Sequence, residues 1–340
     1  MTPEWHRQDA VLLAWPDENT DWKDNLAEIQ ATYREIILAI TTHEKVVLLI
    51  HDNNLCNEIV QFLNESGIDP TKIVFSAMEY DDTWLRDSGP VNILLGDYYP
   101  GYIDYRFNGW GNKFSAEQDD RICQQLFTDD RFQQQKIYQS DIILEGGSIE
   151  TNGQGVLLTT DSCLLSSTRN PQTTRKDYED HFKEFLGIQE TIWLEHGKLA
   201  GDDTDGHIDM LARFCNENTI VYTSCDKPED EHFSALKNME QELVNKAGSF
   251  KLIPLPIPDA IVNHVDQRLP ASYVNFLIIN NAVLVPVYDD PNDEIACERL
   301  AEVFTDRTII PINARSIIQQ GGSLHCLTMQ LNEGLLNQVK

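Results

Sequence analysis

The stretch GGSIETNGQGVLLTT, residues 146–160, decides how the fold of this sequence is interpreted. Two runs of β-forming residues flank a polar segment rich in Asn and Gly, a pattern typical of a β-hairpin. The same pattern occurs in four other segments, which are 89–105, 206–224, 271–288 and 321–331. For the last segment we expect the partner strand at the other end of the chain, in residues 9–16.

Segments with helical periodicity lie between these hairpins. Apolar residues recur at helical spacing near 22–42, 54–66, 115–128, 173–186, 230–247 and 292–305. A short β-rich run follows each helix, at 46–50, 72–75, 136–140, 191–194, 250–255 and 307–312. A strand–strand–helix–strand unit thus recurs with a period of roughly 50 to 65 residues, which indicates an α/β repeat architecture. An ordinary layered α/β domain is the alternative. Since no linker interrupts the pattern, we expect one domain over residues 1–340.

The composition limits the classes of partner. The chain has 26 Lys and Arg against 55 Asp and Glu, a net charge of −29. Such a surface repels nucleic acid and anionic lipid and attracts small cations, although solubility alone also accounts for it. The seven cysteines are odd in number and form no CxxC pair, which favours free thiols in a reducing compartment. The sequence shows neither a signal peptide nor a membrane span, so we expect a cytoplasmic protein.

The repeat predicts a shared site. If the hairpin starts converge on a central axis, Asp87, Glu145, His207 with Asp209, and Cys326 meet there, together with Asn275. Three carboxylates, an imidazole and a thiol suffice for covalent catalysis on a cation. Taken singly, each residue also has a structural interpretation, such as a core cysteine or an Asp that caps a turn.

A metal centre is the main chemical alternative. Asp205-x-His207-x-Asp209 weakly resembles the manganese motifs of the agmatinase-like ureohydrolases. Those enzymes also need a Gly-Gly-Asp-His element and a second Asp-rich cluster, whereas both Gly-Gly pairs here are followed by Ser. We therefore expect no metal, and we expect Asp202, Asp203 and Asp205 to be loop or rim charges.

Five ordered motifs resemble a known family. They are WLRDSGP (84–90), LEGGSIETNGQG (144–155), DGHID (205–209), LPASYVNF (269–276) and GGSLHC (321–326). Together they resemble the agmatine deiminases, which belong with the Porphyromonas-type peptidylarginine deiminases in the guanidine-modifying pentein superfamily. The N-terminal segment EWHRQDAVLLAWP (4–16) also resembles the family's start, so the resemblance covers essentially the whole chain. It implies a five-bladed, pseudo-symmetric α/β propeller of ββαβ units that needs no metal or organic cofactor.

The resemblance also implies roles for the site residues. Cys326 matches the nucleophile, His207 the general acid/base and Glu145 the carboxylate that orients this imidazole. Asp87 and Asp209 match the carboxylates that bind the guanidinium nitrogens. The chain departs from the family pattern in two places, with DGHID for NGHVD and GGSLHC for GGNIHC.

Substrate contacts are expected around these residues. The loop FNGWG (107–111), with Asn108 and Trp110, resembles the aromatic loop that covers the substrate, and Trp84 and Gly322 are further candidates. For both tryptophans core packing is the alternative. Arg169 could bind the carboxylate of free arginine, but we expect a structural ion-pair partner.

The implied reaction is agmatine plus water to N-carbamoylputrescine plus ammonia, in polyamine biosynthesis. Deimination of arginine or peptidylarginine is the nearest alternative. A metal-dependent ureohydrolase and a non-catalytic protein that binds small cations are the others. The expected partner is a small cationic guanidine rather than nucleic acid or membrane, and a homodimer is compatible with the sequence.

Overall fold

The strands of the chain form five small sheets. This computed structural model describes residues 1–65, 67–96, 99–132 and 137–336. Among these residues four sheets have three strands, in the orders β4-β5-β6, β7-β8-β9, β10-β11-β12 and β13-β14-β15. In each, the first two strands are an antiparallel hairpin and the third joins in parallel after a crossover. This is the strand–strand–helix–strand unit that the sequence predicts.

The bounds of these strands follow the predicted β-rich runs. The strands are β4 (Val91–Leu95), β5 (Tyr99–Arg106), β6 (Ile137–Ile143), β7 (Ile149–Thr151), β8 (Val156–Thr160), β9 (Glu190–Leu194), β10 (Ala212–Asn216), β11 (Thr219–Ser224), β12 (Lys251–Pro256), β13 (Leu277–Ile279), β14 (Ala282–Val287) and β15 (Thr308–Asn313). Residues 97–98 of the first predicted hairpin and residue 136 of the predicted strand 136–140 lie outside the described residues.

The fifth sheet joins the two ends of the chain. Its strands are β16 (Met329–Asn332), β1 (Gln8–Ala14), β2 (Lys45–Ile50) and β3 (Ile73–Ala77), in that order. Strand β16 pairs antiparallel with β1, with Leu331 opposite Ala10. The predicted pairing of the last segment with residues 9–16 is therefore confirmed.

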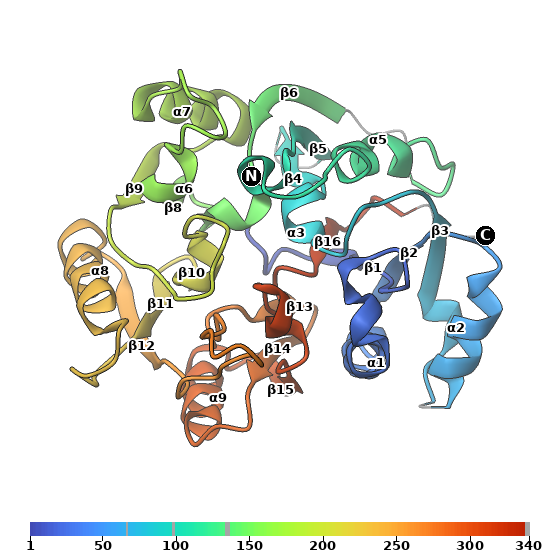
Figure 1. The fold of residues 1–340 in the computed structure, drawn as a ribbon. Coiled ribbons are helices and arrows are strands. Elements are labelled where there is room, and N and C mark those ends of the chain that lie inside the picture. Colours follow the sequence, from blue (N-terminus) through green and yellow to red (C-terminus); the bar gives the residue numbers. More distant parts are fainter. Residues whose placement is uncertain (66, 97–98, 133–136, 337–340) are drawn as a thin grey trace.

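Each predicted helix has a counterpart. The helices are α1 (Leu26–Thr41), α2 (Leu55–Asn64), α5 (Ile122–Leu126), α7 (Arg175–His181), α8 (Phe233–Lys246) and α9 (Asn292–Val303). Helix α5 is shorter than the predicted 115–128, and residue 66 of the predicted 54–66 lies outside the described residues. Figure 1 shows the sheets around the middle of the molecule, with α1, α7, α8 and α9 outside them. Within the described ranges, no helix combines the length and apolar character that crossing a bilayer requires.

The hairpins begin later than predicted. Residues 146, 206, 271 and 321 were expected to start strands, but short turns come first, including the 3-10 turns Gly146–Ser148 and Ile208–Met210. Backbone hydrogen bonds close such turns, as from Ser148 N to Glu145 O and from Thr328 N to His325 O. A strand would alternate its side chains between two faces, whereas a turn groups neighbouring polar side chains on one side. These turns and the short helix α3 (Leu85–Ser88) carry the candidate site residues.

The closing pair β1–β16 gives a stability prediction. Leu331 is fully buried, whereas Leu38 on α1 is 40% exposed. We expect Leu331→Ala to lower the free energy of unfolding by about 2–5 kcal/mol, since it removes buried methyl groups and leaves a cavity. Leu38→Ala should cost less than about 1 kcal/mol. Urea unfolding of both variants checks this, and equal losses would show that the closing pair is not part of the cooperative core.

Candidate active site

The predicted site residues meet around Gly147. A Cβ atom added to Gly147 would lie 2.6 Å from His207 Nδ1, 2.9 Å from Asp87 Oδ1 and 3.1 Å from Asp209 Oδ2. Only a residue without a side chain fits at this point, because His207 and Asp209 from the segment before β10 and Asp87 from α3 approach the same position. The predicted convergence of these residues is therefore present in the structure.

Cys326 is one of the residues that line a cavity. Its Sγ is 3.3 Å from Asn275 Nδ2 and 3.7 Å from Asp209 Oδ2. Burial and the negative charges of Asp209 and Asp87 raise the pKa of the thiol well above its usual range, while hydrogen bonds from Ser323 and Asn275 only partly oppose them. Without a cation nearby, Cys326 is therefore a protonated thiol at neutral pH.

Asp87 is held by two N–H groups. Trp110 Nε1 donates to Oδ2 at 2.8 Å, and the backbone N of Gly147 donates to Oδ1 at 2.9 Å. Burial raises the pKa of Asp87, and so do the charges of Asp209 and Glu145, although His207 and the Trp110 hydrogen bond oppose them. These fixed contacts orient the carboxylate, and a bound cation would favour its ionised form.

The pKa of Asp209 is shifted in the opposite direction from that of Asp87. Its Oδ2 accepts from His325 Nδ1 at 2.8 Å. Burial would raise the pKa of Asp209, but the His325 hydrogen bond and charge, together with His207 and Arg213, hold it below its usual value. Within the described residues Oδ1 has no hydrogen-bond partner. The site thus contains one firmly ionised carboxylate with a free oxygen.

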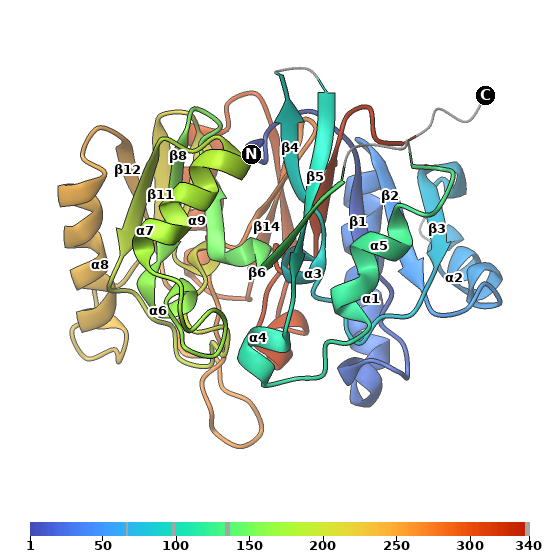
Figure 2. The same ribbon diagram turned by 90° about the horizontal axis from the view of Figure 1, so that it is seen from above.

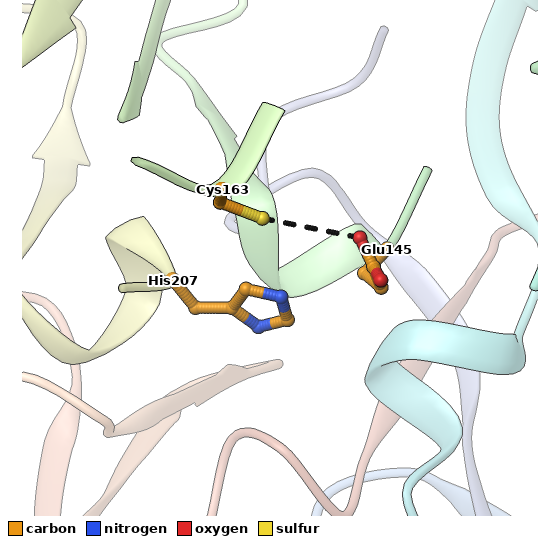
Figure 3. Close-up of side chains that lie close together, drawn as sticks. All are labelled: Glu145, Cys163 and His207. Carbon is orange, nitrogen blue, oxygen red and sulfur yellow. Dashed lines mark hydrogen bonds between the residues drawn. The ribbon is translucent and has the colours of Figure 1, made fainter. Parts of the chain in front are cut away.

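His207 lies in a cluster with Glu145 and Cys163. Figure 3 shows the three side chains pointing toward a common space, with Cys163 on α6 (Asp161–Leu164). His207 Nδ1 is 3.6 Å from Asp87 Oδ1, and in the described part of the chain neither ring nitrogen has a hydrogen-bond partner. Burial lowers the pKa of His207, but Asp87, Cys163 and Glu145 outweigh it and raise the pKa well above the usual value. The imidazole is therefore a proton donor at neutral pH.

Glu145 is bound by an arginine rather than by the histidine. Arg169 Nε lies 2.8 Å and 3.0 Å from the two Glu145 oxygens, and Arg169 Nη1 is 2.6 Å from Asp205 Oδ2. The expected structural ion-pair role of Arg169 is present. The orientation of His207 by Glu145 stays a prediction, since they lie close without a hydrogen bond.

Within the described residues, this cluster is the one group of side chains whose spacing would allow it to bind a metal ion. Ligand atoms of Glu145, Cys163 and His207 lie within 4.8 Å of one another. However, the guanidinium of Arg169 already occupies both oxygens of Glu145 and places a positive charge beside them. The electrostatics therefore disfavour a cation here, and we keep the prediction of no metal.

Of the predicted substrate contacts, Asp87 and three others line the cavity, whereas Asp209 and Asn108 are not among its lining residues. Trp84, Trp110 and Gly322 are among its walls. Trp84 packs on Trp22 with ring centroids 5.7 Å apart, and a Cβ on Gly322 would lie 2.3 Å from the Trp84 ring. Trp110 has the left-handed φ of 55°, a strained backbone for a bulky residue.

The Asn108 side chain stabilises the loop that carries Trp110. Its Oδ1 accepts from Gly111 N at 2.9 Å, and its Nδ2 donates to Thr168 O at 3.0 Å. These bonds hold the strained turn in place, and a direct contact of Asn108 with substrate stays a prediction.

The cavity has a volume of about 1310 Å³ and an acidic lining. Figure 2 shows α4 (Gly109–Asn112) and the loop that follows β12 at the same end of the molecule, and residues of both line the cavity. Burial and neighbouring acids raise the pKa of Asp82 to about 7 and of Asp119 to about 8. A cation in the cavity would relieve this crowding of negative charge.

Sequence reasoning missed four buried partners of the site. Cys163 lies beside Glu145, and Glu4, Arg86 and Arg213 form an ion-pair network behind Asp209. Glu4 stands in the N-terminal segment that also resembles the family, which is the signal that could have identified it. Arg86 lies in the motif WLRDSGP, which is a signal of the same kind, whereas Cys163 and Arg213 lie in apolar runs that predict only core packing.

The site electrostatics predict how Cys326 reacts with iodoacetamide. Because its thiol pKa is raised, alkylation should be slow at neutral pH and should rise with pH beyond the range of an ordinary cysteine. Asp209→Asn removes a negative neighbour, lowers this pKa and should speed alkylation at pH 7.5 by about 10-fold. Mass spectrometry of the Cys326 peptide measures the rate.

Asp266→Asn is the matched control for this measurement. It makes the same chemical change in the same cavity, at a φ of 59° that Asn adopts readily. Its alkylation rate should equal that of the parent protein. Fast alkylation of the parent at neutral pH would contradict the raised thiol pKa.

Comparisons with known proteins agree with this site. A model of the Porphyromonas-type peptidyl-arginine deiminase family matches residues 1–331. A Shewanella baltica protein named "putative agmatine deiminase" is 31% identical over 98% of this chain and 94% of its own. A solved C. jejuni agmatine deiminase variant with substrate bound is 39% identical, with a TM-score of 0.91 over 98% of this chain and 96% of its own. A "putative arginine deiminase" from Porphyromonas gingivalis is 41% identical, with a TM-score of 0.89 over 98% of both chains. The chain therefore belongs to the Porphyromonas-type peptidyl-arginine deiminase family, whose members are hydrolases that act on guanidine C–N bonds.

Proposed function

We propose that the chain is an agmatine deiminase that hydrolyses agmatine to N-carbamoylputrescine and ammonia. The observation that carries the proposal is the meeting of the buried carboxylates of Asp87 and Asp209 at Gly147. Asp209 Oδ2 lies 3.7 Å from Cys326 Sγ, and Asp209 Oδ1 is unpaired among the described residues. A planar guanidinium supplies the missing charge and the missing hydrogen-bond donors at once. Agmatine brings such a group on a short alkyl chain.

The proposed reaction has two steps. Binding of the guanidinium lets the Cys326 thiol release its proton to solvent. The Sγ thiolate then attacks the guanidinium carbon, a C–N bond breaks, and His207 gives its proton to the departing nitrogen, which leaves as ammonia. The carbon then remains bound to sulfur as a positively charged thiouronium. His207, now neutral, takes a proton from water, whose oxygen attacks the same carbon. The C–S bond breaks, and the thiol and the ureido product are released.

The protonation states support this sequence. His207 has a raised pKa and is the proton donor that the first step requires. The thiol of Cys326 has a raised pKa as well, and its causes are burial and the carboxylates that would bind the substrate. A bound guanidinium offsets those negative charges and so favours the thiolate. The nucleophile is thus activated by its own substrate.

The cavity favours agmatine over arginine. Free arginine carries a carboxylate, which needs an available cation in the cavity. The cationic side chains of its lining are already paired, Lys113 with Asp205 and Arg268 with Asp230. Arg169, the other candidate, is buried between Glu145 and Asp205. Agmatine has no carboxylate, and its ammonium group suits the acidic walls.

We further propose that the five sheets are the blades of a pentein propeller, with a single catalytic domain over residues 1–340. The repeated strand order supports the blades, and residues 337–340 lie outside the described residues. The seven cysteines are free thiols, which supports a cytoplasmic location. The activity would supply polyamine biosynthesis, and a homodimer stays compatible with this account.

Product analysis separates the candidate functions. With agmatine as substrate, we expect ammonia and N-carbamoylputrescine in equal amounts, no urea, and no loss of activity after exhaustive chelation. Urea with putrescine would instead indicate a ureohydrolase. Turnover of arginine or peptidylarginine in preference to agmatine would identify another deiminase, and binding of agmatine without turnover would identify a cation-binding protein.

Substitution of the thiol tests the covalent mechanism. Cys326→Ala should lower kcat by at least about 1,000-fold, because the bond-forming atom is removed. Cys297→Ala, on the outer helix α9 and half-buried, is the matched control and should keep kcat within about 2-fold. Substantial activity in Cys326→Ala would contradict the proposed nucleophile.

A further inference from the structure

A buried chain of contacts leads from the N-terminal segment to the substrate carboxylate Asp209. Glu4 Oε2 is 2.5 Å from His325 Nε2, and His325 Nδ1 is 2.8 Å from Asp209 Oδ2. All three residues are buried. A carboxylate oxygen therefore lies within hydrogen-bond distance of each ring nitrogen of His325, and the imidazole bridges the two carboxylates.

Every group that faces the Glu4 carboxylate is a donor. Ile278 N donates to Oε1 at 2.7 Å, and Oε2 accepts from Arg213 Nη2 at 2.8 Å and from Arg86 Nη2 at 3.4 Å in addition to His325. Burial would raise the pKa of Glu4, but Arg213, His325 and Arg86 hold it well below its usual range. A neutral amide could not accept at both positions, so the arrangement requires a carboxylate.

The chain of contacts fixes one oxygen of Asp209 and leaves the other free. Oδ2 is engaged by His325, whereas in the described residues Oδ1 has no partner. Rotation of the carboxylate would break the His325 bond inside a buried site, at the cost of an unsatisfied group. Asp209 is thereby held both ionised and oriented before any cation enters.

We propose that Glu4 is a positioning residue of the site: through His325 it fixes the charge and the direction of Asp209 for the guanidinium. This inference rests on the proposed function and extends it to a residue that touches neither substrate nor nucleophile. Glu4 acts at a distance because the imidazole of His325 bridges two carboxylates. The N-terminal segment is then part of the substrate-binding machinery.

The pH dependence of the Glu4–His325–Asp209 contacts involves a defined set of titratable and charged groups. The groups that face Asp209 are His325, Cys326, His207 and Asp87, with Arg213 and Arg86 further away. Those that face Glu4 are His325, Arg213 and Arg86, with Glu150 further away. Because Asp209 has a lowered pKa in the folded protein, its charge persists at neutral pH and is lost only at acidic pH. Weakening of its His325 partner moves that loss to higher pH.

Glu4→Gln tests the proposal through the pH profile of kcat/KM for agmatine. We expect the acidic limb to move to higher pH and KM at neutral pH to rise about 10-fold or more, with a smaller change in kcat, because the ion that orients the substrate is disturbed. Glu4→Asp keeps the charge and should return the acidic limb toward that of the parent enzyme. An unmoved acidic limb in Glu4→Gln would overturn the proposal.

Glu150→Gln is the matched control. Glu150 is buried and binds the same arginine, with Oε2 3.2 Å from Arg213 Nε, but the contacts of His325 are with Glu4 and Asp209. Both variants should lose thermal stability, since each leaves Arg213 with fewer partners. Only Glu4→Gln should shift the acidic limb. Equal shifts of the acidic limb in both variants would show that Glu4 has only a general structural role, and would also overturn the proposal.

A second readout does not depend on turnover. Nitrogen-15 NMR of histidine-labelled protein should show ring-nitrogen signals of His325 that differ between the parent and Glu4→Gln, because Glu4 lies against Nε2; His325→Gln is used for assignment. Lack of agmatine turnover by the parent enzyme would count against the proposed function alone. An unchanged His325 signal in Glu4→Gln would count against the role of Glu4 alone.

Discussion

The crowding of buried negative charge around one thiol is the constraint on which the structure depends. The buried side chains of Asp87 and Asp209 lie near Cys326, and both raise the pKa of its thiol. Isolated burial of such charges is unfavourable, and the fold compensates with specific donors: Trp110 for Asp87 and His325 for Asp209. The negative charge that these donors leave uncompensated favours a bound cation. The same charge thus connects the electrostatics of the fold with the chemistry that we propose.

These three groups lie on segments that precede three different sheets. Asp87 lies on α3 before β4, Asp209 on the turn before β10, and Cys326 on the turn before β16. Each turn directs its polar side chain toward the same point, where Gly147 leaves the space. Because β16 pairs with β1, the thiol near the end of the chain is anchored by the strand near its beginning.

The sequence was sufficient to predict the repeat, the pairing of the chain ends and the meeting of the polar hairpin starts. These features follow from local patterns, such as alternation in 146–160 and polar residues at equivalent points of each unit. The short turns were wrongly predicted as strands, because a polar residue beside glycines is compatible with either. Cys163, Arg213 and Glu4 were missed because their contacts join residues far apart in the chain, as Glu4 and His325 do.

The central claim is that a guanidinium turns the protonated Cys326 into a nucleophile. Rapid acid quenching during turnover of agmatine, followed by mass spectrometry, tests it most directly. The account predicts a transient mass increase equal to agmatine less ammonia, located on the peptide that contains Cys326. Turnover without any adduct on Cys326 under conditions that preserve thiouronium, or with an adduct on another residue, would contradict it.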